Sequence, residues 1–325
     1  MGKKKSLKYN KFPKQLKGIY SINLKSHFLL LTNNMSNINK TLIGKNGYLF
    51  LINDSANELK VHCENLDLVK DKTLSRYNFN KFVMVVLPNK SLMYKDFLPD
   101  EYNVKYRPAF DIYQNKFKNK IIDAYEILKY EDDTYYKTDT HINLKGNYII
   151  YQKFINKINQ LFDLNMNPRN INILHKSCQL STLDQGIGDL TWSTNLGDQQ
   201  LESTLDNYYF TNDFERFYNK YVIKNDKEIR FLNYELVDET EILENKNEFA
   251  HWNIISKYVI YKKNIDNVSK NKIIIFYDSF LLNILPLYLE LFYEIYMIKQ
   301  VYDSKFINLI KPDYVFEFRA ERFLF

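Results

Sequence analysis

Two short segments of the sequence carry side chains that together could attack an ester. In TDTHIN, Asp139 stands two residues before His141, and YDSF contains Ser279. Positions i and i+2 of an extended segment project to the same side, so the carboxylate can accept the imidazole N–H and fix the tautomer of the ring. A histidine held in this way is a general base, and a serine hydroxyl is the group that it would activate. The two segments suggest a serine nucleophile with its base and orienting acid.

The segment around Ser279 also fits a purely structural role. Asp278 and Ser279 lie between an apolar run and a second, longer one, and Asp and Ser are common caps at the start of a helix. A single Asp-x-His also arises by chance in many chains. Taken alone, the serine is therefore more often a helix cap, and a nucleophile is the alternative.

The other histidines and the cysteines are weaker candidates. His251 lies in AHWN, where the tryptophan and the apolar neighbours favour packing. Three further histidines lack an acid partner in the sequence, namely His27, His62 and His175. Cys63 and Cys178 form neither a CxxC pair nor a Cys/His zinc spacing. We therefore expect no metal ion and no disulfide framework.

The elements that must position these residues alternate between strands and helices. The run from Lys272 to Phe276 is typical of a strand buried on both faces, and the apolar spacing from Leu281 to Lys299 predicts one long helix. Other predicted elements are a hairpin that turns at Asn46 and Gly47, strands at 82–87 and 314–318, and a helix after Gly146. This order predicts an α/β fold with a mostly parallel sheet flanked by helices.

The composition is typical of a globular protein, and the positive charge is concentrated at the start of the chain. The chain has 325 residues, of which 45% are hydrophobic, and its 8 Gly and 7 Pro form no linker. Lysines crowd the start and no acid occurs in the first 18 residues, so we expect a basic arm or cover at 1–40 and one domain at 41–325. A polar insertion is expected at about 165–250.

Several classes of protein have no signature in this sequence. No helix-turn-helix, zinc finger or RNA-recognition pattern occurs, so nucleic acid is not an expected partner. No signal peptide or apolar run of about 18 residues is visible either. By sequence alone, we expect a cytoplasmic or membrane-peripheral protein.

Five segments, in their order along the chain, resemble a known family. They are GKNGYLFL, VVLPNKSLMYKDFLP, YYKTDTHINLKG, YDSF and KPDYVFEFRAERFL. Together they resemble the SGNH-hydrolase-like domain of alginate O-acetyltransferases, the AlgX and AlgJ type, over about residues 41–325. Each segment is a weak signal, but their common order makes the resemblance specific.

The resemblance implies a fold and roles for individual residues. It implies an SGNH-like α/β domain in which Asp139 orients, His141 is the base and Ser279 is the nucleophile that carries the acetyl group. Four further residues are expected to border the site as substrate or oxyanion contacts: Tyr277, Asn89 and Lys90 of these segments, and Asp189 of a Gly-rich loop. Two departures stand out, because Tyr277 occupies a position that is often small and Ile142 replaces a common Trp; we expect them to alter the acyl pocket and substrate stacking.

Three functions follow as hypotheses. The first is a polysaccharide O-acetyltransferase for a capsule, an exopolysaccharide or a related glycan, and the second is an acetylesterase with the same triad and water as the acceptor. The third is a non-catalytic glycan-binding or assembly protein. We expect no tightly bound cofactor and an unknown acetyl donor. The resemblance further implies a membrane-bound protein that supplies acetyl groups, and a periplasmic or cell-envelope location.

Overall fold

The computed structural model describes residues 40–66, 69, 71–171, 173–179, 188–190, 204–210, 219–224, 228–233, 258–264, 267 and 270–324. The expected basic arm lies outside these residues apart from its last position. Most of the expected polar insertion also lies outside them, as do His27 and His251. None of the described helices combines the length and apolar character that a membrane span requires.

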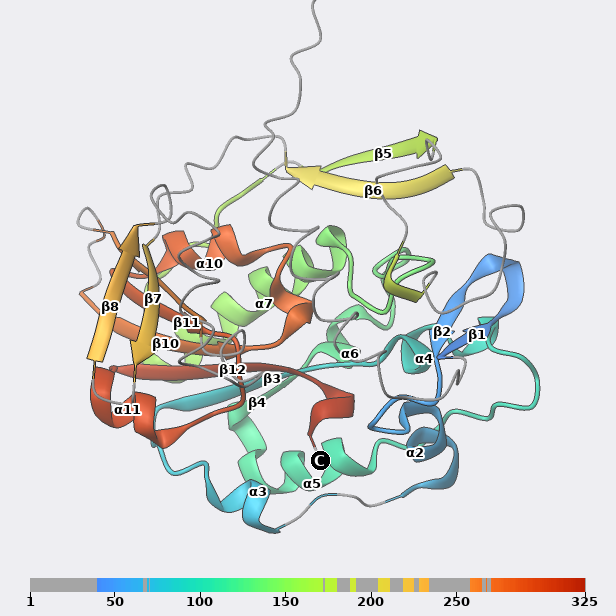
Figure 1. The fold of residues 1–325 in the computed structure, drawn as a ribbon, viewed down its shortest axis with the longest axis horizontal. Coiled ribbons are helices and arrows are strands. Elements are labelled where there is room, and N and C mark those ends of the chain that lie inside the picture. The colour runs from blue at the N-terminus through green and yellow to red at the C-terminus, as the bar shows by residue number, and fades with distance from the viewer. Residues whose placement is uncertain are drawn as a thin grey trace, which may run out of the picture. The chain divides into compact units, whose positions relative to one another are not determined.

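An eight-stranded sheet forms the centre of the described chain (Figure 1). The strands in spatial order are β4 (Ile121–Asp123), β3 (Phe82–Leu87), β12 (Tyr314–Ala320), β10 (Lys272–Tyr277), β11 (Glu294–Ile298), β9 (Tyr258–Lys263), β7 (Asn219–Lys224) and β8 (Glu228–Asn233). The first five run parallel, and β9, β7 and β8 pair antiparallel. The predicted mostly parallel sheet is therefore confirmed.

Helices and short strand pairs surround this sheet. The α-helices are α2 (Glu58–Glu64), α3 (Asp71–Ser75), α4 (Lys90–Met93), α5 (Pro108–Phe117), α6 (Ala124–Leu128), α7 (Leu144–Phe162), α10 (Leu285–Leu291) and α11 (Ser304–Ile310). Short 3-10 turns in the described part of the chain include η1 (Lys45–Gly47), η2 (Lys95–Phe97), η3 (Lys118–Lys120), η6 (Ser279–Leu281) and η7 (Glu321–Phe323). Two antiparallel pairs are β1 (Thr41–Ile43) with β2 (Leu49–Leu51), and β5 (Ile173–Gln179) with β6 (Thr204–Phe210).

The central strands are apolar because the sheet is covered on both faces. All six residues of β3 are buried, and successive side chains point to opposite faces. Val83 and Val85 pack in a cluster with Phe154 of α7, whereas Met84 packs in a second cluster with Phe110 of α5. This double burial explains why the strands show near-continuous apolar runs rather than alternation.

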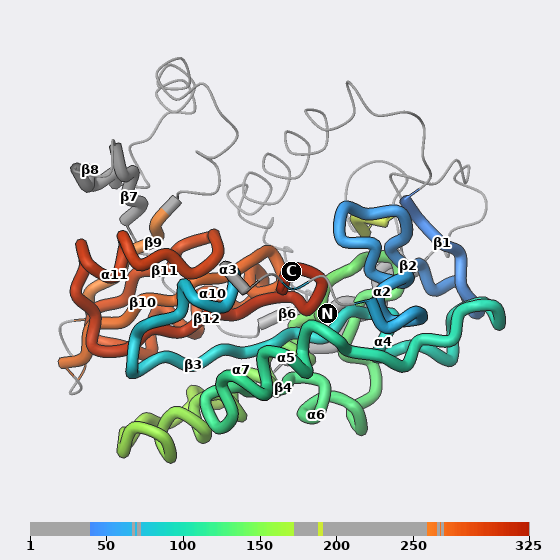
Figure 2. Tube along the Cα trace, turned by 90° about the horizontal axis from the view of Figure 1, so that it is seen from below, coloured from blue at the N-terminus to red at the C-terminus, as the bar shows by residue number. Residues whose placement is uncertain are grey.

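The hairpin predicted at the start of the domain is confirmed. Asn46 and Gly47 adopt φ values of 54° and 76° between β1 and β2, a left-handed conformation that these two residue types tolerate well. Both views place the hairpin beside α2 and α4 (Figures 1 and 2). Phe50, Leu59 and Leu92 bury their side chains together there, in a third apolar cluster.

The single helix predicted from Leu281 to Lys299 is wrong. The segment contains the turn η6, then α10, then the strand β11. Pro286 stands in the first turn of α10, where its missing N–H is harmless, so the helix starts there rather than earlier. After Phe292, β11 lies inside the sheet between β10 and β9, and this pairing overrides the helical spacing of its apolar residues.

A buried ionic cluster offers a test of the fold. Arg107 binds Asp123 at 2.7 Å and Glu321, only 1% exposed, at 2.8 Å. Arg107→Met should lower the free energy of unfolding by about 3–5 kcal/mol, because it leaves the buried carboxylate of Glu321 and the partly buried carboxylate of Asp123 without their cation. Chemical denaturation followed by circular dichroism measures this loss.

The matched control is the exposed pair of Lys60 and Glu64, whose charged atoms lie 3.9 Å apart. Glu64→Gln should change the stability by less than about 0.5 kcal/mol. If Arg107→Met and Glu64→Gln lowered the free energy of unfolding equally, the buried cluster would not stabilise the fold more than an exposed ion pair does.

Candidate active site

The nucleophile candidate lies where β10 ends at the edge of the sheet. Asp278 precedes it and binds two backbone N–H groups: Oδ1 accepts from Phe280 at 3.0 Å and Oδ2 accepts from Ala320 at 2.6 Å. Asp278 therefore caps η6 and joins the ends of β10 and β12. The capping role falls to the aspartate, and the hydroxyl of Ser279 is available to another partner.

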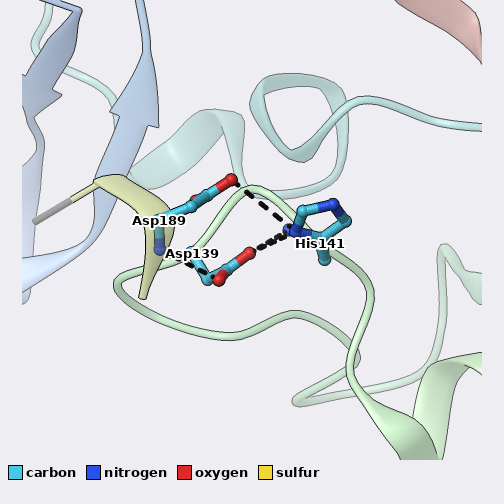
Figure 3. A group of neighbouring side chains, drawn as sticks. All are labelled: Asp139, His141 and Asp189. Atoms are coloured by element: carbon cyan, nitrogen blue, oxygen red, sulfur yellow. Dashed lines mark hydrogen bonds and ion pairs between the residues drawn. The ribbon is translucent and has the colours of Figure 1, made fainter. Parts of the chain in front are cut away.

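That partner is His141. Its Nε2 atom lies 2.8 Å from Ser279 Oγ, although 138 positions separate the two residues in the sequence. Its Nδ1 atom lies 2.6 Å from Asp139 Oδ1 (Figure 3). An ionised carboxylate can only accept a hydrogen bond, so Nδ1 carries the hydrogen and the lone pair of Nε2 faces the serine hydroxyl. This arrangement has the geometry of a serine nucleophile with its general base and orienting acid.

Neighbouring groups shift the pKa values of Asp139 and His141 in the direction that base catalysis needs. Burial alone would raise the pKa of Asp139, but the facing His141 and the backbone N–H groups of Asp189 and His141 lower it well below its usual value. Burial alone would lower the pKa of His141, but the negative charge and hydrogen bond of Asp139 raise it. A raised pKa means a stronger base, which accepts the serine proton more readily.

Lys90 holds the loop that carries the histidine, instead of facing a substrate. Its ammonium group donates to three backbone carbonyls, those of Lys137 at 2.6 Å, Leu49 at 2.8 Å and Asp139 at 3.1 Å. These three bonds use all of its donors. Burial lowers the pKa of Lys90 to about 7. The lysine thereby links β2 to the Asp-x-His loop.

Other residues expected at the site also have partners elsewhere. Asn89 is fully buried; its Nδ2 lies 2.8 Å from His62 Nε2, and its Oδ1 accepts the Arg322 N–H at 3.3 Å. Tyr277 and Ile142 are 2% and 0% exposed and pack in the core on the face covered by α7. The structure therefore brings Ser279, His141 and Asp139 together, whereas the side chains of these other residues are buried in the protein interior.

Asp189 lies on the far side of the histidine ring from the serine. One of its carboxylate oxygens is 3.6 Å from His141 Nδ1. Asp139, His141 and Asp189 have ligand-type atoms within 4.8 Å of one another, a spacing that a metal ion could also use. The direct 2.6 Å hydrogen bond between Asp139 and His141 already accounts for their closeness. This hydrogen-bonded arrangement is also one that acid–base chemistry can use.

A pair of amides joins the two halves of the site, and sequence reasoning missed it. Asn147 Nδ2 donates to the carbonyl of Phe280 at 2.8 Å, one residue after the nucleophile, and to Asn283 Oδ1 at 2.7 Å. Asn283 Nδ2 in turn donates to the carbonyl of Ile142, one residue after the base, at 3.0 Å. The signal in the sequence is a polar residue on the apolar face of the predicted helix, because buried amides are retained for their hydrogen bonds.

Comparison with known proteins supports the fold. No protein-family model matches the chain, and no curated protein matches it significantly. The structure of Bacillus cereus PatB1 aligns with 87% of this chain and 96% of its own, with a TM-score of 0.54 and 17% identity. PatB1 with a sulfonyl adduct aligns with 88% of this chain and 97% of its own, with a TM-score of 0.53 and 17% identity. The chain shares the fold of PatB1.

A weaker likeness is to the O-acetyltransferase domain of Pseudomonas putida AlgJ. It covers 87% of this chain and 91% of that domain, with 14% identity and a TM-score of 0.48. At 17% identity, the likeness to PatB1 concerns the α/β fold and not the activity.

The hydrogen-bonded amides of Asn147 and Asn283, called the amide bridge below, should matter for reactivity as well as stability. Asn147→Ala should cost about 1–3 kcal/mol, because two buried carbonyl or amide oxygens lose their donor. It should also slow acylation of Ser279 by about 10- to 100-fold, since the base and nucleophile lose their common support. Denaturation curves and the rate of acetyl ester cleavage measure the two effects.

Asn159, near the other end of α7, is the matched control. It binds the backbone of Met166 through two hydrogen bonds of 2.7 and 3.1 Å. Asn159→Ala should lose similar stability and keep the cleavage rate. A comparable loss of rate in both variants would show that the bridge acts only through general stability.

Proposed function

We propose that the chain is a serine-dependent O-acetyltransferase of the SGNH-hydrolase-like type that modifies a carbohydrate hydroxyl. The observation that carries the proposal is the chain of contacts from Asp139 to His141 at 2.6 Å and from His141 to Ser279 at 2.8 Å. The five sequence segments that resemble alginate O-acetyltransferases support the same reaction. The shared fold of PatB1 is compatible with it.

In the first half of the reaction, His141 Nε2 takes the proton of Ser279 Oγ as this oxygen attacks the acetyl carbonyl of the donor. The resulting tetrahedral intermediate collapses, and the leaving group of the donor departs with the proton from His141. An acetyl-serine ester remains. Asp139 accepts the Nδ1 hydrogen throughout and stabilises the imidazolium that forms between the two proton transfers.

In the second half, His141 removes the proton of an acceptor hydroxyl, which attacks the acetyl-serine carbonyl. The serine oxygen leaves and recovers its proton from the imidazolium. A sugar hydroxyl as the acceptor gives O-acetylation of a polysaccharide or oligosaccharide, in a capsule, an exopolysaccharide or a related glycan. We propose that the protein holds no tightly bound cofactor and that a membrane-bound protein partner supplies the acetyl group; the chemical identity of the donor is unknown.

The nucleophile can be tested without knowing the natural donor. A sulfonyl fluoride should form a covalent adduct with Ser279, and mass spectrometry should locate it there. Ser279→Ala should abolish both the adduct and the cleavage of a chromogenic acetyl ester, with a rate loss of at least about 10³-fold and an unchanged circular dichroism spectrum.

Adding oligosaccharide acceptors to the ester assay separates transfer from hydrolysis. Acetylated sugar in the products supports the transferase, whereas release of acetate alone under every acceptor supports the esterase. An intact rate in Ser279→Ala would refute the catalytic reading altogether.

The pH dependence follows from the base. Neutral imidazole is the active form, and Asp139 raises the pKa of His141 above its ordinary value near 6.5. The rate should therefore be full above that raised pKa and fall as the pH drops through it. Asp139→Asn should move this fall to lower pH and reduce the maximal rate by about 10³- to 10⁴-fold. An acid limb that stays in place in this variant would contradict the assignment of the base.

A further inference from the structure

A three-residue segment from a distant part of the chain lies against the Asp-x-His loop. It consists of Gly188, Asp189 and Leu190. The Leu190 N–H donates to the carbonyl of Thr138 at 3.3 Å, and the Leu190 carbonyl accepts the hydroxyl of Thr41 in β1 at 2.6 Å. The segment is therefore tied to the catalytic loop on one side and to the hairpin on the other.

Gly188 shows how closely the two segments approach. A Cβ atom at this position would lie 2.1 Å from the carbonyl oxygen of Thr138 and 2.7 Å from the Asp139 side chain. Real Cβ atoms do not come so near to a backbone oxygen, so a side chain here would push the segment away from the loop. Glycine permits the contact that brings the next residue to the histidine.

Asp189 contacts the site through both its backbone and its side chain. Its N–H donates to Asp139 Oδ2 at 3.0 Å, and its carboxylate accepts the N–H of Thr140 at 2.8 Å and the hydroxyl of Thr140 at 2.6 Å. These bonds aim one carboxylate oxygen at His141 Nδ1, 3.6 Å away. Figure 3 shows both carboxylates directed at the same edge of the imidazole ring.

We propose that Asp189 is a positioning residue for the catalytic base, so that the Nδ1 edge of His141 faces two carboxylates instead of one. The proposal deepens the proposed function and rests on the role of His141 in it. The Asp189 N–H orients Asp139, and the Asp189 carboxylate adds a second negative charge beside the imidazolium that forms in each half of the reaction.

The position of the carboxylate distinguishes this role from direct contact with the substrate. Nδ1 and Nε2 lie on opposite sides of the imidazole ring, and Ser279 faces Nε2. A carboxylate near Nδ1 is therefore separated by the ring from the carbonyl that the serine attacks. An ionised carboxylate also offers no hydrogen to an oxyanion. Asp189 thus acts through His141 and not as an oxyanion donor.

The charged groups around the ring are consistent with this electrostatic role. Asp139 and Asp189 raise the pKa of His141, whereas burial and the cation of Arg322 lower it. Burial and the neighbouring Asp139 also raise the pKa of Asp189. The ammonium group of Lys90, bound to the Asp139 carbonyl, is a further cation near both carboxylates. Removing the Asp189 charge should therefore make His141 a weaker base.

An NMR titration of the histidine rings tests the proposal directly. The His141 signal is identified by its absence in His141→Gln, and its pKa is measured in the wild type and in Asp189→Asn. The asparagine keeps the backbone N–H and the size of the side chain but removes the charge. The pKa of His141 should fall by about one unit or more.

Asp100→Asn is the matched control, since it removes one negative charge from an exposed side chain that binds Lys45. It should leave the His141 pKa unchanged. If Asp189→Asn does not fold, Asp189→Ala replaces it, because it removes the same charge and should lower the pKa of His141 in the same way. Asp189→Glu, which restores the charge, should return at least part of the shift, and a merely structural role would not produce this pattern.

Activity gives a second readout. In Asp189→Asn the acid limb of the ester cleavage profile should move to lower pH together with the His141 pKa, and the maximal rate should drop about tenfold. A His141 pKa within about 0.2 units of the wild type in Asp189→Asn and Asp189→Ala would overturn the proposal, even if Ser279→Ala abolishes activity. A clear pKa shift in a protein without serine-dependent activity would instead keep the electrostatic coupling of Asp189 to His141 and refute the proposed function.

Discussion

The hydrogen bond between His141 and Ser279 joins two segments that are far apart in the chain. Several surrounding groups hold these two segments in place. Neither segment is held by regular secondary structure at the point of contact, because the histidine lies in a loop and the serine begins a 3-10 turn. Asn147 and Asn283 connect the carbonyl next to each residue. The buried amide of Asn147 and the partly buried amide of Asn283 therefore help to fix the distance between His141 and Ser279, because hydrogen bonds of such groups are costly to leave unmade.

The same edge of the sheet carries several other buried polar groups of the described chain. Strands β3, β10 and β12 run parallel, so their carboxyl ends meet at one edge, as in other open parallel sheets. Beyond these ends lie Lys90, Asp278 and Glu321, each buried and each bound by hydrogen bonds or ion pairs. Such a set of satisfied charges holds the loops around His141 and Ser279 in place.

The sequence-based predictions succeeded where residues close in the chain determine the structure, and failed where contacts with distant segments determine it. The strands at 82–87 and 272–276 and the helix after Gly146 were predictable, because long runs of one pattern dominate their local structure. The segment 281–299 was not, because its apolar residues are spaced as in a helix while β11 gains hydrogen bonds inside the sheet. Lys90 and Asn89 were expected as substrate or oxyanion contacts, whereas the structure binds them to groups of four other segments, and those partners carry no local signal in the sequence.

The sequence by itself determined the contacts between residues that are close in the chain: the carboxylate of Asp139 beside the ring of His141, the turn at Asn46 and Gly47, and a cap at the end of β10. Backbone geometry over two or three residues suffices for these. Only the tertiary structure decided that Ser279 meets His141 and that Asp189 reaches the same ring from about 50 positions away. Those contacts depend on strand order and on the packing of loops against one another, and no spacing of residue types encodes either.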